Sequence, residues 1–344
     1  GVAGGASTAA RLRRLDEQAE IVLFERGDHI SYANCGLPYH AGGLIPERER
    51  LFVMTPTKFK QWLAVDVRTG TEIVAIDPAR KVVSAKVLAT GTILEEPYDK
   101  LVLSPGAAPL RPPIPGLDLE GVFTLRSVPD VDRIKAWLDG RSPRRAVVIG
   151  GGFIGLEMAE NLHRRGLGVT VVEALDQVMG PLDPEMAALV QTQLRAKGVE
   201  LVLGTAVAAI EQRGKGLAAT LASGRELPAD LVILSVGVRP DTAFAKAAGL
   251  ACSPSGAIVV DAAMRTSDPH IFALGDAVEV QSPVLGKAVS VPLAGPATKQ
   301  ARVVAENVAR GLKDSGAPAR HYGGALGTAI AKVFDITAAS TGPN

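Results

Sequence analysis

The stretch Arg145-Ala-Val-Val-Ile-Gly-Gly-Gly-Phe-Ile-Gly155 decides the fold of the chain around it. Its first five residues, an arginine followed by four apolar residues, predict a buried strand, and Gly150–Gly155 matches the pattern G-x-G-x-x-G. A helix is predicted over 156–165, and Val169-Thr-Val-Val-Glu173 predicts a second strand that ends in an acid. Strand, glycine-rich turn, helix, strand and acid follow one another within about 30 residues. This order predicts a βαβ unit that binds a dinucleotide pyrophosphate at the amino end of its helix.

The acid at the end of the second strand indicates which cofactor is bound. Glu173 would accept hydrogen bonds from a free ribose 2′-hydroxyl, which favours NAD. The residues just after it include no arginine or lysine to hold a 2′-phosphate. The sequence therefore predicts NADH, with NADPH as the alternative. A solvated acid at a strand end is the other interpretation of Glu173.

The amino-terminal residues predict part of a second unit of this kind. Gly1-Val-Ala-Gly-Gly5 runs into a predicted helix, and the apolar stretch 21–25 predicts a strand that ends at Glu25. Gly5 would let the helix pack close to the strand, and Glu25 would accept hydrogen bonds from an adenosine ribose. The first strand and the first glycine of the motif are absent, so we expect the sequence to be incomplete there. The alternative is an ordinary glycine-rich turn before a helix.

Between the two signatures lies Ser31-Tyr-Ala-Asn-Cys-Gly-Leu-Pro-Tyr39, which holds one of only two cysteines. Its Asn, Gly and Pro residues suit a core strand poorly, which argues against Cys35 as a small buried hydrophobe. No second cysteine stands at C-x-x-C spacing, so Cys35 would pair with an external sulfur or cycle through sulfenic acid. A helix that begins near Gly36–Pro38 would depress its pKa. His40 is predicted to lie on the surface rather than to donate a proton to Cys35, and Cys252 lies in a predicted turn.

Other segments give a coarser outline. A helix is predicted over 51–62, and strands over 71–76, 81–88 and 98–103 predict a small antiparallel sheet. The proline-rich stretch 104–116 predicts a connection between domains. A long helix is predicted from Pro292 through Gly311.

The composition excludes several classes of function. The chain has 344 residues, and its 37 basic and 36 acidic residues give a net charge of +1, so neither nucleic acid nor an anionic membrane is an expected partner. Aromatic residues are only 4%, and no apolar run reaches the roughly 18 residues that a membrane span needs. The five histidines have no metal-ligand spacing, so no metal is predicted. Two distant cysteines indicate a reducing cytoplasm.

Taken together, the motifs resemble the flavin-dependent pyridine nucleotide–disulfide oxidoreductases. Within that family the chain is similar to the group of coenzyme A disulfide reductases, NADH oxidases and persulfide reductases. The resemblance covers essentially the whole chain and is carried by Ser31–Tyr39, Gly150-Gly-Gly-Phe-Ile-Gly-Leu-Glu157, Leu274-Gly-Asp276, Pro292-Leu-Ala-Gly-Pro-Ala297 and Gly327-Thr-Ala-Ile-Ala-Lys-Val-Phe-Asp335.

The resemblance implies an α/β fold with two Rossmann-like dinucleotide-binding domains, each with a small antiparallel β element, and the start of an α/β dimer-interface domain. The implied domains are an FAD-binding domain over 1–113 and 241–313, an NAD(P)-binding domain over 114–240, and the opening of the dimerisation domain over 314–344. Most of that last domain is expected to be missing. In the family it completes a homodimer, and a rhodanese domain follows in some members.

The resemblance also assigns residues. Cys35 is the implied catalytic residue, and Phe153 would cover the flavin until nicotinamide displaces it. The helix after Pro292 would direct its amino end at the isoalloxazine. Arg11 departs from the residue usual at its position. Implied substrate contacts are Ser7, Arg11, Arg14, Ser31 and Asn34; implied FAD contacts are Gly1, Val2, Ala3, Gly4, Gly5, Glu25, Arg26, Ile73, Ser104, Gly106, Gly275, Asp276, Pro292, Leu293, Ala294 and Ala297; implied NAD contacts are Gly150, Gly152, Phe153, Ile154, Gly155, Glu157, Glu173 and Gly237.

Three functions follow as hypotheses. The first is a reductase that passes a hydride from NAD(P)H through FAD to a sulfur substrate at Cys35, namely coenzyme A disulfide, a coenzyme A persulfide or polysulfide. The second is an NADH oxidase that reduces oxygen with a Cys35 sulfenate. The third is a flavin-binding redox sensor without turnover. A solvated helix face is the alternative interpretation of the Arg11–Arg14 pair.

Overall fold

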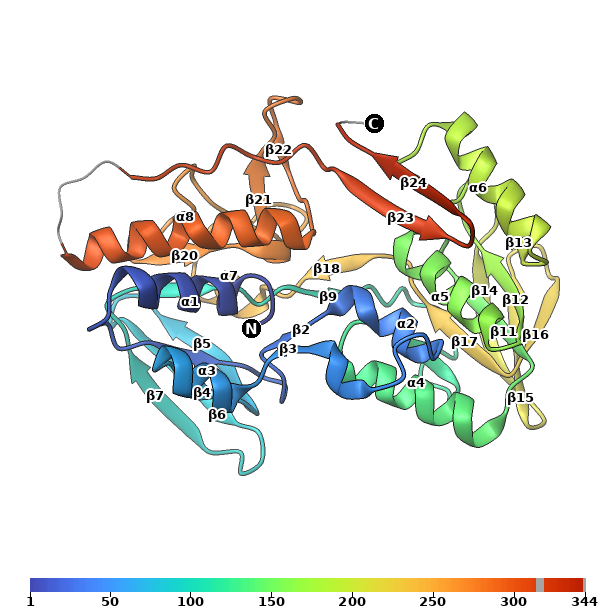
Figure 1. Cartoon of the computed structure of the whole chain (residues 1–344), viewed down its shortest axis with the longest axis horizontal. Helices are drawn as coiled ribbons and strands as arrows, with labels where there is room; N and C mark the ends of the chain where they lie inside the picture. Colours follow the sequence, from blue (N-terminus) through green and yellow to red (C-terminus); the bar gives the residue numbers. More distant parts are fainter. Residues whose placement is uncertain (314–318, 343–344) are drawn as a thin grey trace. The chain divides into compact units, whose positions relative to one another are not determined.

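The computed structural model describes residues 1–313 and 319–342, and these residues form two compact units of mixed α/β structure (Figure 1). Unit 1 comprises 1–32, 52–108 and 239–326, and unit 2 comprises 33–51, 109–238 and 327–344. The chain passes from one unit to the other within the short strands β9 (Ala107–Pro109) and β18 (Val238–Pro240), and also after residues 32, 51 and 326.

Unit 2 is built on a five-stranded parallel sheet in the order β10-β17-β11-β12-β13. The central strand β11 (Arg145–Ile149) and its neighbour β17 (Leu231–Leu234) are apolar and buried apart from the exposed Arg145, because helices cover parallel sheets on both faces. The other strands are β10 (Val122–Thr124), β12 (Gly168–Val172) and β13 (Glu200–Val202), and the helices are α4 (Val128–Arg141), α5 (Phe153–Arg164) and α6 (Pro184–Ala196). The βαβ unit predicted around the G-x-G-x-x-G motif is therefore present as β11-α5-β12.

Smaller elements complete unit 2. An antiparallel sheet consists of β14 (Val207–Arg213), β15 (Gly216–Leu221) and β16 (Glu226–Ala229). The hairpin of β23 (Ala329–Val333) and β24 (Ile336–Ser340) is fastened by the buried carboxylate of Glu160, which accepts a hydrogen bond from the Phe334 backbone at 2.7 Å. Helix α2 (Leu37–Ala41) follows the short turn η1 (Asn34–Gly36) and packs against α5 and α4, and η2 (Arg48–Leu51) ends this segment.

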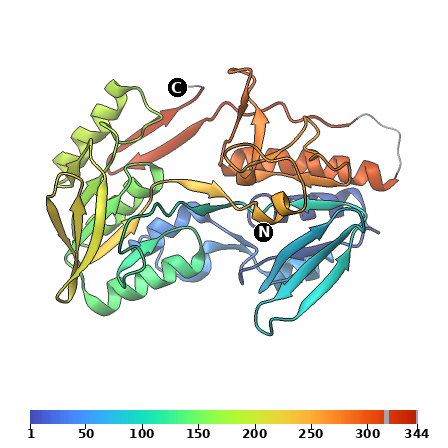
Figure 2. The same ribbon diagram turned by 180° about the vertical axis from the view of Figure 1, so that it is seen from behind.

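Unit 1 contains parallel strand pairs, among them β1 (Val22–Phe24) with β4 (Asp66–Arg68), β8 (Leu101–Leu103) with β20 (Ile271–Ala273), and β19 (Ile258–Val259) with β21 (Val278–Gln281). Helices α1 (Gly5–Leu15) and α8 (Ala294–Lys313) lie side by side, as the front and back views both show (Figures 1 and 2). Apolar residues of α8 pack with β8, β20 and Leu12 of α1 in one core. The remaining elements are β2 (Ser31–Tyr32), β3 (Phe52–Met54), α3 (Pro56–Leu63), α7 (Ala243–Ala247), η3 (Gly275–Ala277) and β22 (Ala288–Val289).

The small antiparallel sheet of unit 1 differs from the prediction. It consists of β5 (Thr71–Asp77), β6 (Val82–Val87) and β7 (Ile93–Pro97), the cyan strands of Figure 2. The strand predicted over 98–103 begins only at Leu101 and pairs in parallel with β20 instead. β7 escaped prediction because its residues are mostly exposed and carry two glutamates, so it lacks a buried apolar pattern.

The helix predicted over 51–62 begins later, at Pro56. Thr55 caps it by accepting a hydrogen bond from the Lys58 backbone, and Phe52–Met54 forms strand β3 instead. Proline suits the first helical turn because its missing N–H has no partner there in any case. The predicted domain limits after 113, 240 and 313 stay predictions, and the last of them adjoins residues 314–318, which lie outside the described residues. Across the described ranges, no helix is both long and apolar enough to cross a membrane.

Candidate active site and anion pocket

The glycine-rich turn of unit 2 has the geometry that a dinucleotide needs. Gly150 has a φ of +104°, and a Cβ there would lie 2.4 Å from the carbonyl oxygen of Ser235. A Cβ on Gly155 would lie 2.0 Å from the Gly150 carbonyl oxygen, whereas a Cβ on Gly152 would meet no atom within 4 Å. The first and last glycines are therefore required by packing, and Gly152 leaves the space that a pyrophosphate takes.

The acid of the motif lies at the same edge of the sheet. Glu173 follows β12, and its Oε2 accepts a hydrogen bond from the Gly151 backbone at 2.6 Å. The first turn of α5 itself carries no acidic residue. Phe153 and Ile154 open this helix and Gly237 follows β17, so the predicted NAD residues gather at the carboxyl edge of the sheet. These residues fit a nicotinamide dinucleotide.

Two glycine substitutions distinguish a glycine that is required by packing from one that leaves space for the ligand. We expect Gly155→Ala to lower the thermal stability of the protein by ~1–3 kcal/mol, because the new methyl group collides with fixed backbone. Gly152→Ala is expected to leave the melting temperature unchanged and to weaken NADH binding, since its methyl group enters open space. Differential scanning fluorimetry with and without NADH measures both effects. Equal melting temperatures for the two variants would contradict this account of the turn.

The corresponding turn of unit 1 fits an adenine dinucleotide. Gly1–Gly5 lead into α1, whose first turn also lacks acidic residues. A Cβ on Gly4 would lie 2.2 Å from the Ser104 side-chain oxygen, so a larger residue would displace that hydroxyl group. Glu25 follows β1, and its carboxylate contacts the Gly1 nitrogen at 3.0 Å and the Gly27 backbone N–H at 2.9 Å.

The other predicted FAD residues are distributed over unit 1. Arg26 pairs with Glu72 at 3.2 Å and with Asp241 at 3.1 Å. The Gly275 backbone donates a hydrogen bond to Gln300 of α8 at 2.8 Å, which joins the turn before Asp276 to that helix. Helix α8 begins at Ala294, two residues after the predicted start. Val2 and Ala3 belong to the first turn, Ile73 lies on β5, Gly106 follows β8, and Leu293, Ala294 and Ala297 lie at the start of α8.

Cys35 lies in unit 2, in the turn η1 directly before α2. Because α2 packs against α5, the carboxylate of Glu157 comes within electrostatic range of the Cys35 thiol. Partial desolvation and then the charge of Glu157 raise the pKa of Cys35 above its ordinary value. The depressed pKa predicted from the sequence is therefore not found: the pKa is raised, and the only lowering cause among the described residues is a backbone hydrogen bond at Cys35 itself.

Glu157 is itself perturbed. Burial, followed by repulsion from Glu160, raises its pKa from 4.5 to about 7. Burial and the charge of Glu157 also raise the pKa of Tyr39. Glu160 forms ion pairs with Arg164 at 2.9 Å and with Lys332 at 3.4 Å. The cluster thus contains a carboxyl group that changes charge near neutral pH beside the cysteine.

Two predictions about neighbouring residues need correction or comment. His40 is not on the surface: it is 2% exposed, and its Nδ1 lies 2.7 Å from the carbonyl oxygen of Ile45, because α2 turns this side inward. Cys252 lies in unit 1, where its backbone forms an isolated antiparallel β-bridge with Ile258, and burial raises the pKa of its thiol. In the part of the chain that the structure describes, no group of acidic, histidine and cysteine residues could hold a metal ion.

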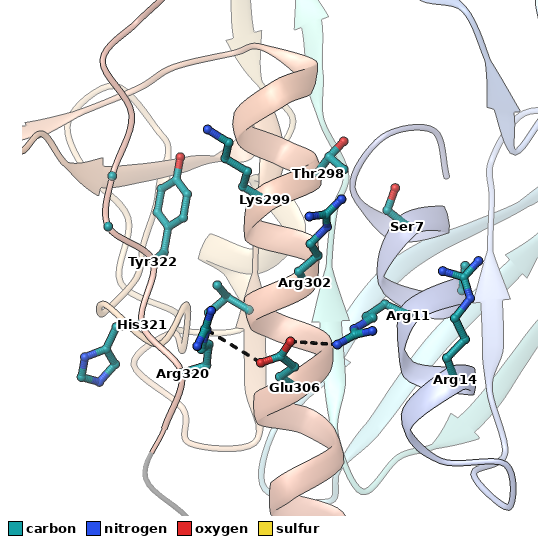
Figure 3. A pocket seen from close by; sticks show the side chains of 14 residues that line it. Ser7, Arg11, Arg14, Thr298, Lys299, Arg302, Glu306, Arg320, His321 and Tyr322 are labelled. Atoms are coloured by element: carbon teal, nitrogen blue, oxygen red, sulfur yellow. Dashed lines mark hydrogen bonds and ion pairs between the residues drawn. The ribbon is translucent and has the colours of Figure 1, made fainter.

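A basic pocket of about 740 Å³ lies in unit 1 between α1, α8 and the segment around Arg320 (Figure 3). Its lining includes Ser7, Arg11 and Arg14 of the predicted substrate residues. Ser31 lies on β2 of the same unit without lining the pocket, and Asn34 lies in unit 2. Sequence reasoning missed the cations Lys299, Arg302 and Arg320.

The missed cations had a partial signal in the sequence. Lys299 and Arg302 are three residues apart, and such residues share one face of a helix. That face could be recognised as functional only once α1 was known to lie beside it. Within the described residues, Arg14, Lys299 and Arg302 form no ion pair, and they stay available to an anion. Phosphate groups are the ligands that such a cluster favours.

A model of the pyridine nucleotide-disulphide oxidoreductase family matches residues 1–301, which is most of the chain. The chain belongs to this family. It is 35% identical to a coenzyme A disulfide reductase of Staphylococcus haemolyticus, over 99% of the chain and 74% of that protein. Family membership confirms the α/β fold with Rossmann-type domains that the motifs predicted.

Solved structures of the family agree. The chain superposes on reduced CoADR-RHD of Bacillus anthracis with a TM-score of 0.95 and 48% identity, over 100% of this chain and 60% of that one. It superposes on an NAD-dependent persulfide reductase of A. fulgidus with a TM-score of 0.94 and 42% identity, over 100% of this chain and 63% of that one. The sequence thus spans less than two thirds of these two family members.

Proposed function

We propose that this family member is an FAD-dependent reductase that uses NADH, or alternatively NADPH, to reduce a coenzyme A disulfide, a coenzyme A persulfide or a polysulfide at Cys35. The basic pocket carries the proposal. Five cationic side chains face one carboxylate there, and this balance suits a ligand with several phosphate groups, as coenzyme A has. The similarity to a coenzyme A disulfide reductase supports the same substrate class.

The chain's own residues would act as follows. The turn Gly1–Gly5 and Glu25 would hold FAD, and Gly150–Gly155 with Glu173 would hold NADH. Bound FAD would supply the transfer of two electrons from the nicotinamide to sulfur. Cys35, as thiolate, would attack one sulfur of coenzyme A disulfide, forming a mixed disulfide and releasing one coenzyme A thiolate.

The two electrons would then cleave the mixed disulfide, regenerate the Cys35 thiolate and release the second coenzyme A thiolate. Since Cys35 has no partner cysteine nearby in the sequence, an internal disulfide cannot serve as the relay. A homodimer of the full-length protein stays a prediction.

Comparison of two disulfides tests the substrate. We expect kcat/KM for coenzyme A disulfide to exceed that for pantethine, which lacks the nucleotide and its phosphates, by roughly 100-fold. A charge-assisted hydrogen bond contributes about 1.5–3 kcal/mol, so the loss of one or two has this effect. NADH consumption and thiol release are measured together at low salt. Equal kcat/KM values for the two disulfides would remove the phosphate pocket from the proposal.

A further inference from the structure

Among the described residues that line the basic pocket, Glu306 is the only acid. It lies on α8, and its Oε1 is 3.1 Å from Nη2 of Arg11, while its Oε2 is 3.8 Å from Nε of Arg320. Figure 3 shows the two arginines directed at Glu306 from opposite sides, Arg11 from α1 and Arg320 from the segment beyond α8. One carboxylate thus connects three elements of unit 1 at the pocket.

A carboxylate in a pocket for anions needs a reason, because it repels the ligand. At a separation of about 4 Å near a protein surface, that repulsion can reach ~4 kcal/mol. The ion pairs themselves contribute little to folding. Arg11 and Arg320 are 39% and 65% exposed, and exposed pairs are typically worth ~0–1 kcal/mol. Neither general anion affinity nor stability therefore accounts for Glu306.

The orientation of the two arginine side chains does account for the presence of Glu306. An arginine binds phosphate best through two parallel N–H donors, and this geometry requires a fixed guanidinium plane. Glu306 engages one edge of Arg11, and the buried Nε of Arg11 has no hydrogen-bond partner among the described residues. Among the described residues, Arg14, Lys299 and Arg302 have no ion-pair partner and can supply the general attraction. Arg11 and Arg320 can then supply the directed hydrogen bonds that determine how the ligand is oriented.

We propose that Glu306 is a positioning residue that sets the specificity of this pocket. By fixing Arg11 and Arg320 on either side of α8, it favours a ligand with two separated phosphate groups over a single phosphate ion. This inference rests on the proposed function, in which the ligand is the 3′-phosphorylated ADP end of a coenzyme A substrate.

Calorimetric binding to the full chain supplied with FAD tests the inference. The probes are 3′-phospho-ADP and inorganic phosphate, and the measured quantity is the ratio of their dissociation constants. We expect Glu306→Gln to reduce this ratio at least tenfold, because phosphate binds more tightly and the nucleotide more weakly. Glu306→Asp is expected to restore most of the preference. Glu95→Gln is the matched control, since Glu95 forms an exposed pair with Arg80 outside the pocket.

A double-mutant cycle shows whether Glu306 acts through Arg11. We expect Glu306→Gln and Arg11→Gln together to change the ratio less than the sum of the two single effects. Arg11→Gln alone carries the test if Glu306→Gln does not fold.

The outcomes separate the two proposals. A wild-type chain without preference for 3′-phospho-ADP would refute the proposed substrate, and the inference with it. A wild-type preference that survives Glu306→Gln unchanged would refute only the role of Glu306. If Glu306→Gln increased the affinity for both probes by the same factor, the role of Glu306 would likewise be refuted, since Glu306 would then merely repel anions.

Discussion

Replacing Cys35 with serine is expected to abolish NADH-dependent thiol production, with a loss of roughly 10³-fold or more. Serine can neither form a disulfide with the substrate nor ionise near neutral pH. Binding of FAD and NADH is expected to persist, because the residues assigned to both cofactors are untouched. Thiol release and NADH consumption are followed in the same sample, with coenzyme A disulfide as the substrate.

The same variant distinguishes the three hypotheses. An oxidase would continue to consume NADH and would release hydrogen peroxide once its sulfenate was lost. A redox sensor would show no turnover in either the wild type or the variant. Cys252→Ser is the control and is expected to keep full activity, since Cys252 lies in unit 1, which does not contain Cys35. Unchanged thiol production by Cys35→Ser would refute the role of Cys35.

Replacing Glu157 with glutamine is expected to shift the ionisation of Cys35 to lower pH. The charge of Glu157 is the second cause, after desolvation, of the raised pKa of Cys35. Since Glu157 itself has a pKa of about 7, its charge is present above neutral pH and absent below it. Glutamine removes this charge at every pH. The variant thiol should therefore be more reactive above pH 7, and the two proteins should converge at lower pH.

The rate of Cys35 alkylation against pH measures this shift, in a Cys252→Ser background. Other charges near the cluster are Glu160, Arg164 and Lys332, which stay in place, and His40 is bound to backbone. Glu185→Gln, an exposed acid on α6, is the control. Superimposable alkylation profiles for the wild type and Glu157→Gln would show that Glu157 does not act on the thiol.

The free energy of unfolding should also depend on the ionisation of Glu157. A carboxyl group whose pKa is raised on folding stabilises the fold below its unfolded pKa of 4.5, and this contribution is lost as the pH rises through about 7. The difference between these two pKa values corresponds to at most ~3 kcal/mol. Glu157→Gln should therefore be more stable than the wild type at pH 8 and similar at pH 4. Urea unfolding at both pH values measures the difference.

The elements that could be predicted from the sequence are those whose signal lies within one short stretch. The unit β11-α5-β12 was predictable because its apolar periodicity, its glycines and Glu173 lie within one short stretch. Strand β7 was missed because its side chains are exposed and carry no apolar pattern. His40 was misplaced because a five-residue helix is too short to reveal which face is buried.

The sequence by itself determined the family, the two glycine-rich turns and the lack of a partner cysteine near Cys35. Each of these features follows from residues that are neighbours in the sequence. Only the tertiary structure decided which charges face one another. Arg11, Glu306 and Arg320 meet because α1 packs along α8, and Glu157 reaches Cys35 because α2 packs against α5. Such contacts depend on the complementary shapes of distant segments, which local periodicity does not encode.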